Sequence, residues 1–176
     1  MKHTAPENLA EVVPGRGAAY AAYPQAASGF VNAPPVDNGF LGAAGGLRST
    51  ASDLCLWFEA LLGGKVLSPA LAGAMLEPAR LADGSLPKLN QNPTNPPIAG
   101  PDGYVRYGFG LILEEPSDRG PWIWHAGLWS GVMGEIRKHA QRDVTWAFLL
   151  NGSPAAVNTL PPVQELVGVL NVAALA

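Results

Sequence analysis

The clearest periodic pattern along the chain is a run of apolar residues at helical spacing between residues 50 and 64. The apolar positions, which recur at i, i+3, i+4 and i+7, are Leu54, Trp57, Phe58 and Leu61. This spacing predicts an amphipathic helix whose apolar stripe faces a core. Thr50 and Asp53 form a capping-box-like pair at its start, and two consecutive glycines, 63 and 64, are typical of a helix C-terminus.

Two further helices are expected. A shorter one should span residues 69–76, because Ser68 is a good N-cap and Pro69 is tolerated in the first helical turn. A C-terminal helix should start near residues 160–162 and lie across a sheet. Its apolar stripe consists of Val163, Leu166, Val167, Leu170 and Ala174.

From residue 105 the apolar period changes to two. Alternation over 107–113 predicts a strand of about eight residues, and further strands are expected at 122–125, 132–137 and 144–150. The last run is apolar on both sides, which favours an interior strand covered on both faces. Short links between neighbours predict an antiparallel meander. The expected class is therefore α+β, an antiparallel sheet of about four strands with the C-terminal and preceding helices packed on it.

The remaining segments have little periodicity. Residues 1–48 are rich in Pro and Gly and are expected to form an irregular wrapping segment, and residues 78–104 form a long loop. We expect one domain over 1–176, with helices in 49–77, strands in 105–152 and the last helix in 160–175.

Composition narrows the functional classes. A hydrophobic content of 48% with 14% charged residues is typical of a folded, soluble chain, and a net charge of −3 gives no electrostatic reason to bind nucleic acid or an anionic membrane. No apolar run reaches the roughly 18 residues needed to span a bilayer. The start of the chain lacks the apolar core of a signal peptide, so its localisation is left open. The single Cys55 permits no internal disulfide.

The main candidate for chemistry is the triplet His125-Ala126-Gly127 after the strand at 122–125. A histidine and a glycine two residues apart at a strand end present an imidazole and a closely approachable backbone to a ligand. The triplet alone is common by chance, and a histidine in a half-buried strand is the simpler alternative.

Other candidates are weaker. Ser85 and Lys88 form a Ser-x-x-Lys sequence, but Pro87 between them opposes the helical turn that such a pair needs. The glycines at 42–46 lack phosphate-loop spacing and predict tight backbone packing. His3, His125, His139 and Cys55 have no metal-ligand spacing, so no metal or other cofactor is expected. His139 is expected to be an exposed turn residue.

Several short motifs together resemble the serine β-lactamase-like family, which includes class C β-lactamases, penicillin-binding DD-peptidases and related esterases. They occur in the family's order over nearly the whole chain. They are residues 1–4 (MKHT), 44–54 (AGGLRSTASDL), 67–69 (LSP) with 75–76 (ML), 107–110 (YGFG), 125–127 (HAG) and 149–152 (LLNG).

This resemblance implies a role for each residue around the triplet. His125 matches the first position of the family's Lys/His-x-Gly element and would orient a polar group of the substrate or join the proton network. Gly127 matches the glycine that lets the acyl group approach, and the backbone N–H of Leu128 would be an oxyanion-hole donor. Ala126 replaces the more frequent Thr or Ser. Leu128 and Trp129 stand where many relatives carry small residues, which favours an esterase or promiscuous hydrolase.

The resemblance also implies elements that we do not find in the 176 residues, namely a helical Ser-x-x-Lys and a Tyr-x-Asn or Ser-x-Asn. We therefore expect the C-terminal portion of a serine hydrolase acting on a small ester or amide, inactive alone. Its expected partner is the missing N-terminal portion of the same fold, without which it is expected to self-associate. The alternative is a non-catalytic module that binds a ligand or a partner.

Overall fold

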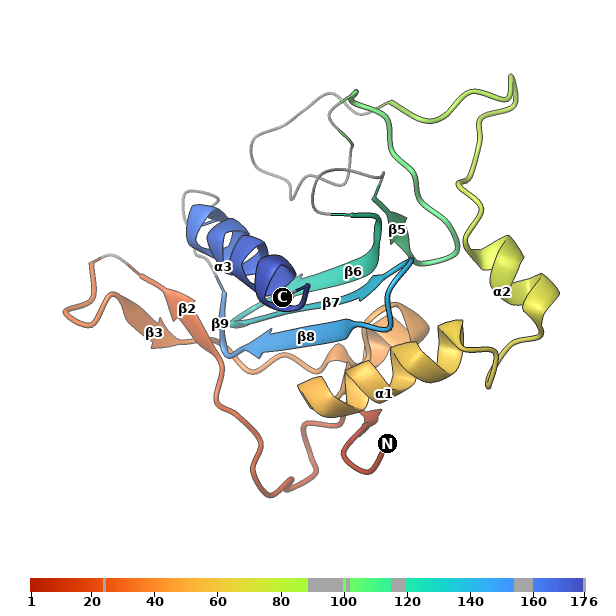
Figure 1. Ribbon diagram of the computed structural model, residues 1–176. Helices are drawn as coiled ribbons and strands as arrows, with labels where there is room; N and C mark the ends of the chain where they lie inside the picture. Colours follow the sequence, from red (N-terminus) through yellow and green to blue (C-terminus); the bar gives the residue numbers. More distant parts are fainter. Residues whose placement is uncertain (24, 89–99, 101, 115–119, 154–159, 176) are drawn as a thin grey trace.

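A four-stranded antiparallel sheet lies at the centre of the part of the chain that the structure describes (Figure 1). This computed structural model describes residues 1–176 except 24, 89–99, 101, 115–119, 154–159 and 176. The strand order is β5-β6-β7-β8, with bounds Ile112–Leu113, Trp122–Trp129, Val132–His139 and Thr145–Leu150. Helix α1 (Ala51–Leu62) lies on one face and α3 (Leu160–Ala173) on the other. The predicted α+β class is confirmed.

The hairpin formed by β6 and β7 is longer than expected. Trp129 pairs with Val132 across a two-residue turn of Ser130 and Gly131, so β6 continues four residues beyond the predicted end at His125. Gly131 makes this turn possible because its φ is +75°, a backbone conformation that residues with a side chain rarely adopt. The His-Ala-Gly triplet therefore lies inside a strand and not at its end.

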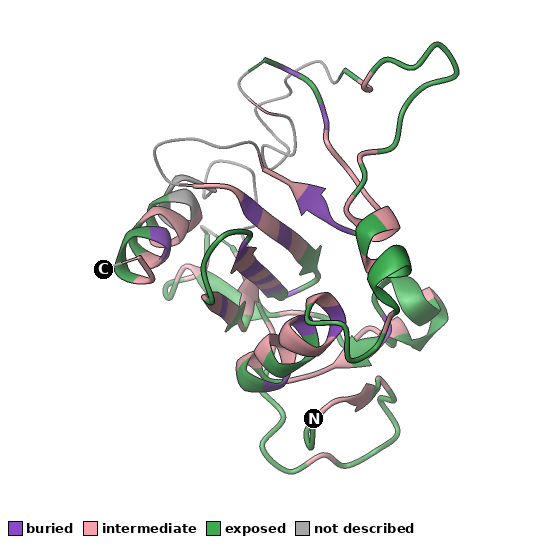
Figure 2. Cartoon of the chain, turned by 45° about the vertical axis from the view of Figure 1, so that its right-hand side comes forward, coloured by how far each residue is buried: buried purple, intermediate pink, exposed green. Residues whose placement is uncertain are grey.

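Tryptophan side chains form the core between the sheet and α3. Trp122 is fully buried, and Trp124, Trp146 and Ile112 are at most 9% exposed. Val167, Leu170 and Ala174 of the C-terminal segment pack against this cluster, as the predicted stripe requires. The Trp146 indole N–H donates to Asn171 Oδ1 at 3.2 Å, so the polar tip of this ring is satisfied inside the core. Figure 2 shows burial alternating along the sheet strands.

A charged network lies inside this tryptophan layer. The Arg137 guanidinium is 4.3 Å from the centre of the Trp124 ring and forms ion pairs with Glu135 and Glu114. Burial raises the pKa of Glu135, and the neighbouring Arg137 opposes that rise. The guanidinium therefore stacks on the Trp124 and Trp146 rings and also forms ion pairs with two carboxylates. These two kinds of interaction together offset the cost of burying its charge.

Helix α1 covers the opposite face of the sheet. The Thr50 side chain accepts from the Asp53 N–H at the helix start, and Gly64 adopts φ +74° after its end, as both patterns predicted. Lys138 on β7 bonds the Glu59 carboxylate at 2.7 and 2.9 Å, which ties the helix to the sheet. Phe58 and Leu61 are buried, whereas Trp57 is 39% exposed, so the predicted stripe is wrong at that residue.

The Asp53 carboxylate does not complete a capping box. It accepts the backbone N–H groups of Lys2 and His3 and the Thr4 hydroxyl, at 3.3, 2.7 and 2.9 Å. These bonds, led by the one from His3, lower the pKa of Asp53. The motifs at residues 1–4 and 44–54 therefore have a shared physical purpose, which is to fasten the first residues to the start of α1.

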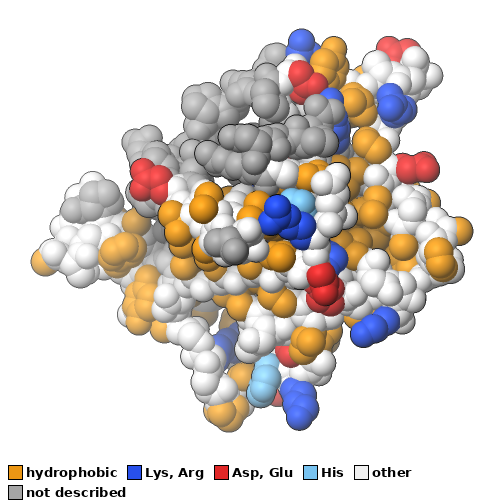
Figure 3. Space-filling view, in the orientation of Figure 1, with side chains coloured by type: hydrophobic (Ala, Val, Ile, Leu, Met, Phe, Trp, Pro, Cys, Tyr) orange, Lys and Arg blue, Asp and Glu red, His pale blue; other side chains and the backbone are white. Residues whose placement is uncertain are grey.

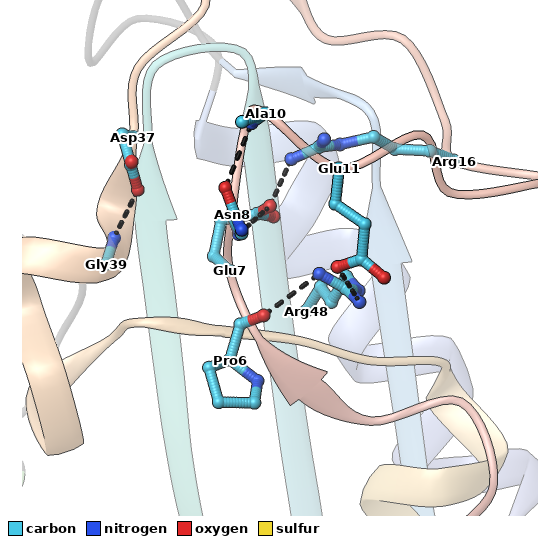
Figure 4. Close-up of polar contacts among 9 residues, drawn as sticks. All are labelled: Pro6, Glu7, Asn8, Ala10, Glu11, Arg16, Asp37, Gly39 and Arg48. Atoms are coloured by element: carbon cyan, nitrogen blue, oxygen red, sulfur yellow. Dashed lines mark hydrogen bonds and ion pairs between the residues drawn. The ribbon is translucent and has the colours of Figure 1, made fainter.

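Arg48 fastens the next part of the N-terminal segment. It belongs to β4 (Leu47–Arg48), which pairs with β1 (Ala5–Pro6), and its guanidinium donates to the Pro6 carbonyl at 2.9 Å and to Glu11 at 2.7 Å (Figure 4). Arg16 forms an ion pair with Glu7 in the same view. The predicted wrapping segment thus contains short regular elements, which also include β2 (Tyr20–Ala22), β3 (Phe30–Asn32) and the 3-10 helix η1 (Asn38–Ala44).

A second small sheet links this segment to the hairpin. Its order is β3-β2-β9, with β9 (Gly152–Ser153) parallel to β2. The Tyr20 N–H donates to the Gly131 carbonyl at 3.3 Å, and a Cβ on Gly131 would overlap Ala33 Cβ. The turn between β6 and β7 is therefore packed directly against the N-terminal segment.

The predicted strand over 107–113 is wrong. Only β5 is a strand there, because the chain turns back at Gly108 to Gly110, where the Gly108 N–H donates to the Leu111 carbonyl at 2.8 Å. Gly110 has φ +74°, and a Cβ on Gly108 would overlap the carbonyl of Met75, the last residue of α2 (Pro69–Met75). The alternation of glycine with apolar residues at 107–111 therefore indicates a tight turn that packs against the end of α2. Helix α2 itself lies away from the sheet (Figure 1).

Two other expectations need correction. Strand β8 stands at the end of the four-stranded sheet in the described residues and is not interior, although helices cover both of its faces. His139 is 4% exposed and packs edge-on against Trp122 at 5.0 Å between ring centres. It is buried because Gly120 lacks the Cβ that would overlap the imidazole.

We predict that His139 makes the fold sensitive to mild acid. Burial and, to a smaller degree, Arg142 lower the pKa of His139 below its ordinary 6.5, and its Nδ1 accepts the Gln141 N–H at 3.1 Å, so the folded state holds it neutral. The unfolded chain takes up the proton first, so this contribution is complete above about pH 6.5 and is lost as the pH falls toward the lowered folded pKa.

Denaturant unfolding between about pH 5 and 8 measures this effect. The non-titrating variant His139→Asn should show a smaller fall in the free energy of unfolding toward low pH than the unmodified chain. The comparison isolates His139, because the lowered pKa of His125 acts in the same direction and the raised pKa of Glu135 acts in the opposite direction in both proteins. Equal slopes in the two proteins would contradict the assignment.

Candidate functional site

The residues around the triplet are sorted onto two faces by the pleat of β6. Trp122 and Trp124 point into the core under α3, and Ala126 packs against the same core. The alternation of a strand places His125, Gly127 and Trp129 on the other face, which α1 partly covers. The two tryptophans and His125 therefore lie on opposite faces of the sheet.

The same alternation determines where the backbone groups of β6 point. The Trp122 carbonyl accepts the Glu114 N–H at 2.8 Å on the side of β5, whereas the Pro121 carbonyl accepts the Ala140 N–H at 2.9 Å after β7. In an antiparallel strand the N–H and C=O of one residue share a side and successive residues alternate. The amides of Ala126 and Leu128 therefore point away from β7.

That edge of β6 has no strand neighbour among the described residues beyond Trp124. The pairing with β5 ends where Ile112 faces Trp124. The N–H and C=O groups of Ala126 and Leu128 thus lie along a strand edge that the described part of the chain leaves open. An unpaired edge with fixed, parallel N–H groups is suited to bind a carbonyl or an oxyanion.

His125 is half-buried and has one hydrogen-bond partner in the described residues. Its Nε2 lies 3.0 Å from the Tyr107 hydroxyl, and the two rings meet edge-on. Burial lowers the pKa of His125, so the imidazole is neutral at neutral pH. A neutral imidazole supplies one donor and one acceptor, so this histidine binds by hydrogen bonds and not as a cation.

Gly127 differs from the glycines that the fold needs. A Cβ built on it meets no atom within 4 Å, and its φ is not in the left-handed region. Gly134, which pairs with it on β7, has Leu149 within 2.7 Å of such a Cβ. The described fold gives no steric reason for a glycine at 127, so the open space beside it is available to another group.

Apolar side chains surround this end of the hairpin. Leu128 is 55% and Trp129 38% exposed, and the Trp129 ring lies 6.1 Å from that of Phe40 in η1. Val132 and Leu149 are also exposed. Large exposed apolar side chains that lie close together are typical of a surface that binds a ligand or another protein segment.

The other sequence candidates are not brought to this edge as a pair. Residues 85–88 are not helical, the Ser85 hydroxyl donates to Asp83 at 2.6 Å, and the Lys88 ammonium lies over the Tyr104 ring. In the described residues no three His, Cys, Asp or Glu side chains converge as metal ligands, and no helix there is long and apolar enough to cross a membrane. Burial and Glu59 raise the pKa of Cys55, which disfavours a nucleophilic thiolate.

Tyr107 is the residue at this site to which sequence reasoning assigned no role. It entered only as the first residue of the motif at 107–110, and nothing in the spacing indicated that its hydroxyl reaches His125. The partner is 18 positions away, and the turn at Gly108 to Gly110 that carries it was taken for a strand.

The family model described as Beta-lactamase matches residues 2–167. The chain belongs to the beta-lactamase family. A search of curated proteins finds no match. Among solved structures, this beta-lactamase family member resembles a D-stereospecific amidohydrolase from Streptomyces sp., with a TM-score of 0.63 and 17% identity over 93% of this chain. At that identity the likeness shows a common fold. The chain spans 43% of that amidohydrolase chain, so it holds part of that fold.

We predict that Gly127→Ala leaves the free energy of unfolding within about 0.5 kcal/mol of the original, because its Cβ would meet open space. Gly131→Ala is the matched control, since it forces a positive φ and overlaps Ala33, and should cost about 1–3 kcal/mol. Thermal and denaturant unfolding measure both. A loss at Gly127 as large as that at Gly131 would show that the space beside Gly127 is filled by the fold.

Proposed function

We propose that this chain is the C-terminal part of a serine hydrolase that cleaves an ester or amide through an acyl-enzyme, and that the nucleophilic serine lies outside the 176 residues. The observation that carries the proposal is the open edge of β6, where the His125 imidazole, the unobstructed Gly127 and the outward N–H of Leu128 follow one another. These are the groups that one wall of an acyl-transfer site requires.

Each residue has a distinct task in this proposal. The N–H of Leu128 stabilises the oxyanion that forms when the serine attacks, and it does so regardless of the Leu128 side chain. Gly127 leaves room for the acyl group, and His125 forms a hydrogen bond to a polar group of the substrate. Ala126 contributes backbone only, since its side chain faces the core. Trp129 gives the site an apolar border.

The substrate class is a small ester or amide. The structural neighbour is named as a D-stereospecific amidohydrolase, which makes an amide of D configuration a third substrate to test beside an ester and a cephalosporin. Charge gives no further direction, because Figure 3 shows charged side chains scattered over the visible face and not gathered in a patch of one sign.

A second candidate function is a non-catalytic module that binds a ligand or partner at the same edge. The separate partners of Ser85 and Lys88 favour it, because they leave the chain without a paired nucleophile and base in its described residues. Coding sequence upstream of residue 1 discriminates between the two candidates. An in-frame Ser-x-x-Lys and Tyr-x-Asn supports the hydrolase, and a natural start preceded by a promoter supports the module.

We predict that the 176-residue chain alone does not hydrolyse nitrophenyl butyrate or a chromogenic cephalosporin, whereas the protein extended by its upstream coding sequence does. Release of nitrophenol and opening of the cephalosporin ring are followed by absorbance. Turnover by the 176 residues that disappears when one of their own serines is replaced would overturn the assignment of the nucleophile to another segment.

A backbone substitution makes the test specific for the Leu128 amide. Leu128→Pro removes the N–H on the open side, where no strand bond in the described sheet is lost, and should lower kcat by about 10²–10³-fold in the extended protein. Leu128→Ala is the matched control, because it removes the side chain and keeps the N–H. An equal loss in both variants would mean that the side chain and not the amide matters.

We also propose that the exposed apolar residues Phe40, Trp129, Val132 and Leu149 contact the rest of the same fold, and that copies of the isolated chain associate through them. Light scattering with increasing concentration should detect this association. Leu149→Lys should reduce it, and Val12→Lys, at a residue 93% exposed in the N-terminal segment, should not. A monodisperse monomer at all concentrations would contradict the proposal that these residues form a contact surface.

A further inference from the structure

A hydrogen bond between Tyr107 and His125 joins the turn before β5 to strand β6. The sequence pattern did not predict this contact. Tyr107 stands at the turn before β5, forms an isolated bridge with Ile112, and packs its ring against the tryptophan core. This packing holds the phenol in place, and its hydroxyl lies 3.0 Å from His125 Nε2. Within the described residues neither side chain has another hydrogen-bond partner.

The direction of this hydrogen bond determines what His125 can offer to a ligand. Burial lowers the pKa of His125, so one ring nitrogen carries a proton and the other a lone pair. An imidazole nitrogen is a stronger base than a phenol oxygen, and a phenol O–H is a good donor. The stronger arrangement is therefore Tyr107 O–H donating to Nε2, which leaves the proton of the imidazole on Nδ1.

We propose that Tyr107 is a positioning residue that holds His125 in its Nδ1–H tautomer, so that His125 presents a hydrogen-bond donor at the open edge of β6 and not a general base. The lone pair of Nε2 is occupied by the Tyr107 hydroxyl. The group left for a ligand is the Nδ1–H, which suits an acceptor such as a carbonyl or carboxylate oxygen. The ligand part of this inference rests on the proposed function, whereas the tautomer does not.

The tautomer is read directly from the imidazole ¹⁵N signals of the 176-residue chain at neutral pH. In the unmodified protein His125 should show a protonated Nδ1 and an unprotonated Nε2. Tyr107→Phe keeps the packed ring and removes the donor, so the proton should redistribute toward Nε2. Tyr104→Phe is the matched control, because that phenol lies beside Lys88 and not beside a histidine in the described structure, and it should leave the His125 signals unchanged.

Either of two results would overturn the inference. One is a protonated Nε2 on His125 in the unmodified chain, a measurement that needs no variant to fold. The other is the same His125 tautomer in Tyr107→Phe as in the original, with both proteins folded by circular dichroism. These outcomes are separate from the hydrolase assay, since an inactive extended protein would reject the proposed function and leave the tautomer as measured.

Discussion

The burial of two tryptophans on one side of β6 is the constraint on which the arrangement of the site depends. Trp122 and Trp124 occupy the core beneath α3, and a strand places successive residues on opposite faces. His125 and Gly127 must then lie on the other face, and the amides of Ala126 and Leu128 must point to the edge away from β7. A slip of one residue would bury the imidazole and turn the Leu128 amide into the sheet.

Among the residues that the structure describes, the shortness of β5 is what leaves that edge without a strand neighbour. Ile112 faces Trp124, so a strand continuing back to Tyr107 in the same register would pair with β6 as far as Trp129 and cover the outward amides of Ala126 and Leu128. The turn at Gly108 to Gly110 prevents this, because Gly110 takes a left-handed conformation and Gly108 packs against the Met75 carbonyl. The same turn brings the Tyr107 hydroxyl to His125. One local feature therefore both exposes the edge and sets the partner of its histidine.

Charged groups secure the scaffold on both faces of the sheet. Arg137 lies against Trp124 with Glu135 and Glu114 on the α3 side, and Lys138 reaches Glu59 on the α1 side. Removing one member of the buried pair between Arg137 and Glu135 would leave an uncompensated buried charge, which is costly. These ion pairs also explain how β7 can bury or half-bury Glu135, Arg137 and Lys138.

Local patterns were sufficient for the helices. The spacing and caps of α1, the Ser68 cap of α2 and the apolar stripe of α3 depend on residues close together in the chain, and so does the apolar run of β8. Trp57 and His139 were misplaced for a different reason. The exposure of Trp57 depends on how far the sheet extends beneath α1. The burial of His139 depends on the missing Cβ of Gly120, which leaves room for the imidazole. Both are contacts between segments far apart in the chain.

By itself the sequence determined the α+β class, the position of the triplet beside the tryptophans and its resemblance to the beta-lactamase family, since these follow from short-range periodicity and from motif order. Only the tertiary structure decided that β6 runs through the triplet, that no strand of the described residues pairs with its edge from His125 onward, and that Tyr107 is bonded to His125. Strand pairing and side-chain partners are set by packing between segments far apart in the chain, and no local pattern encodes the register in which those segments meet.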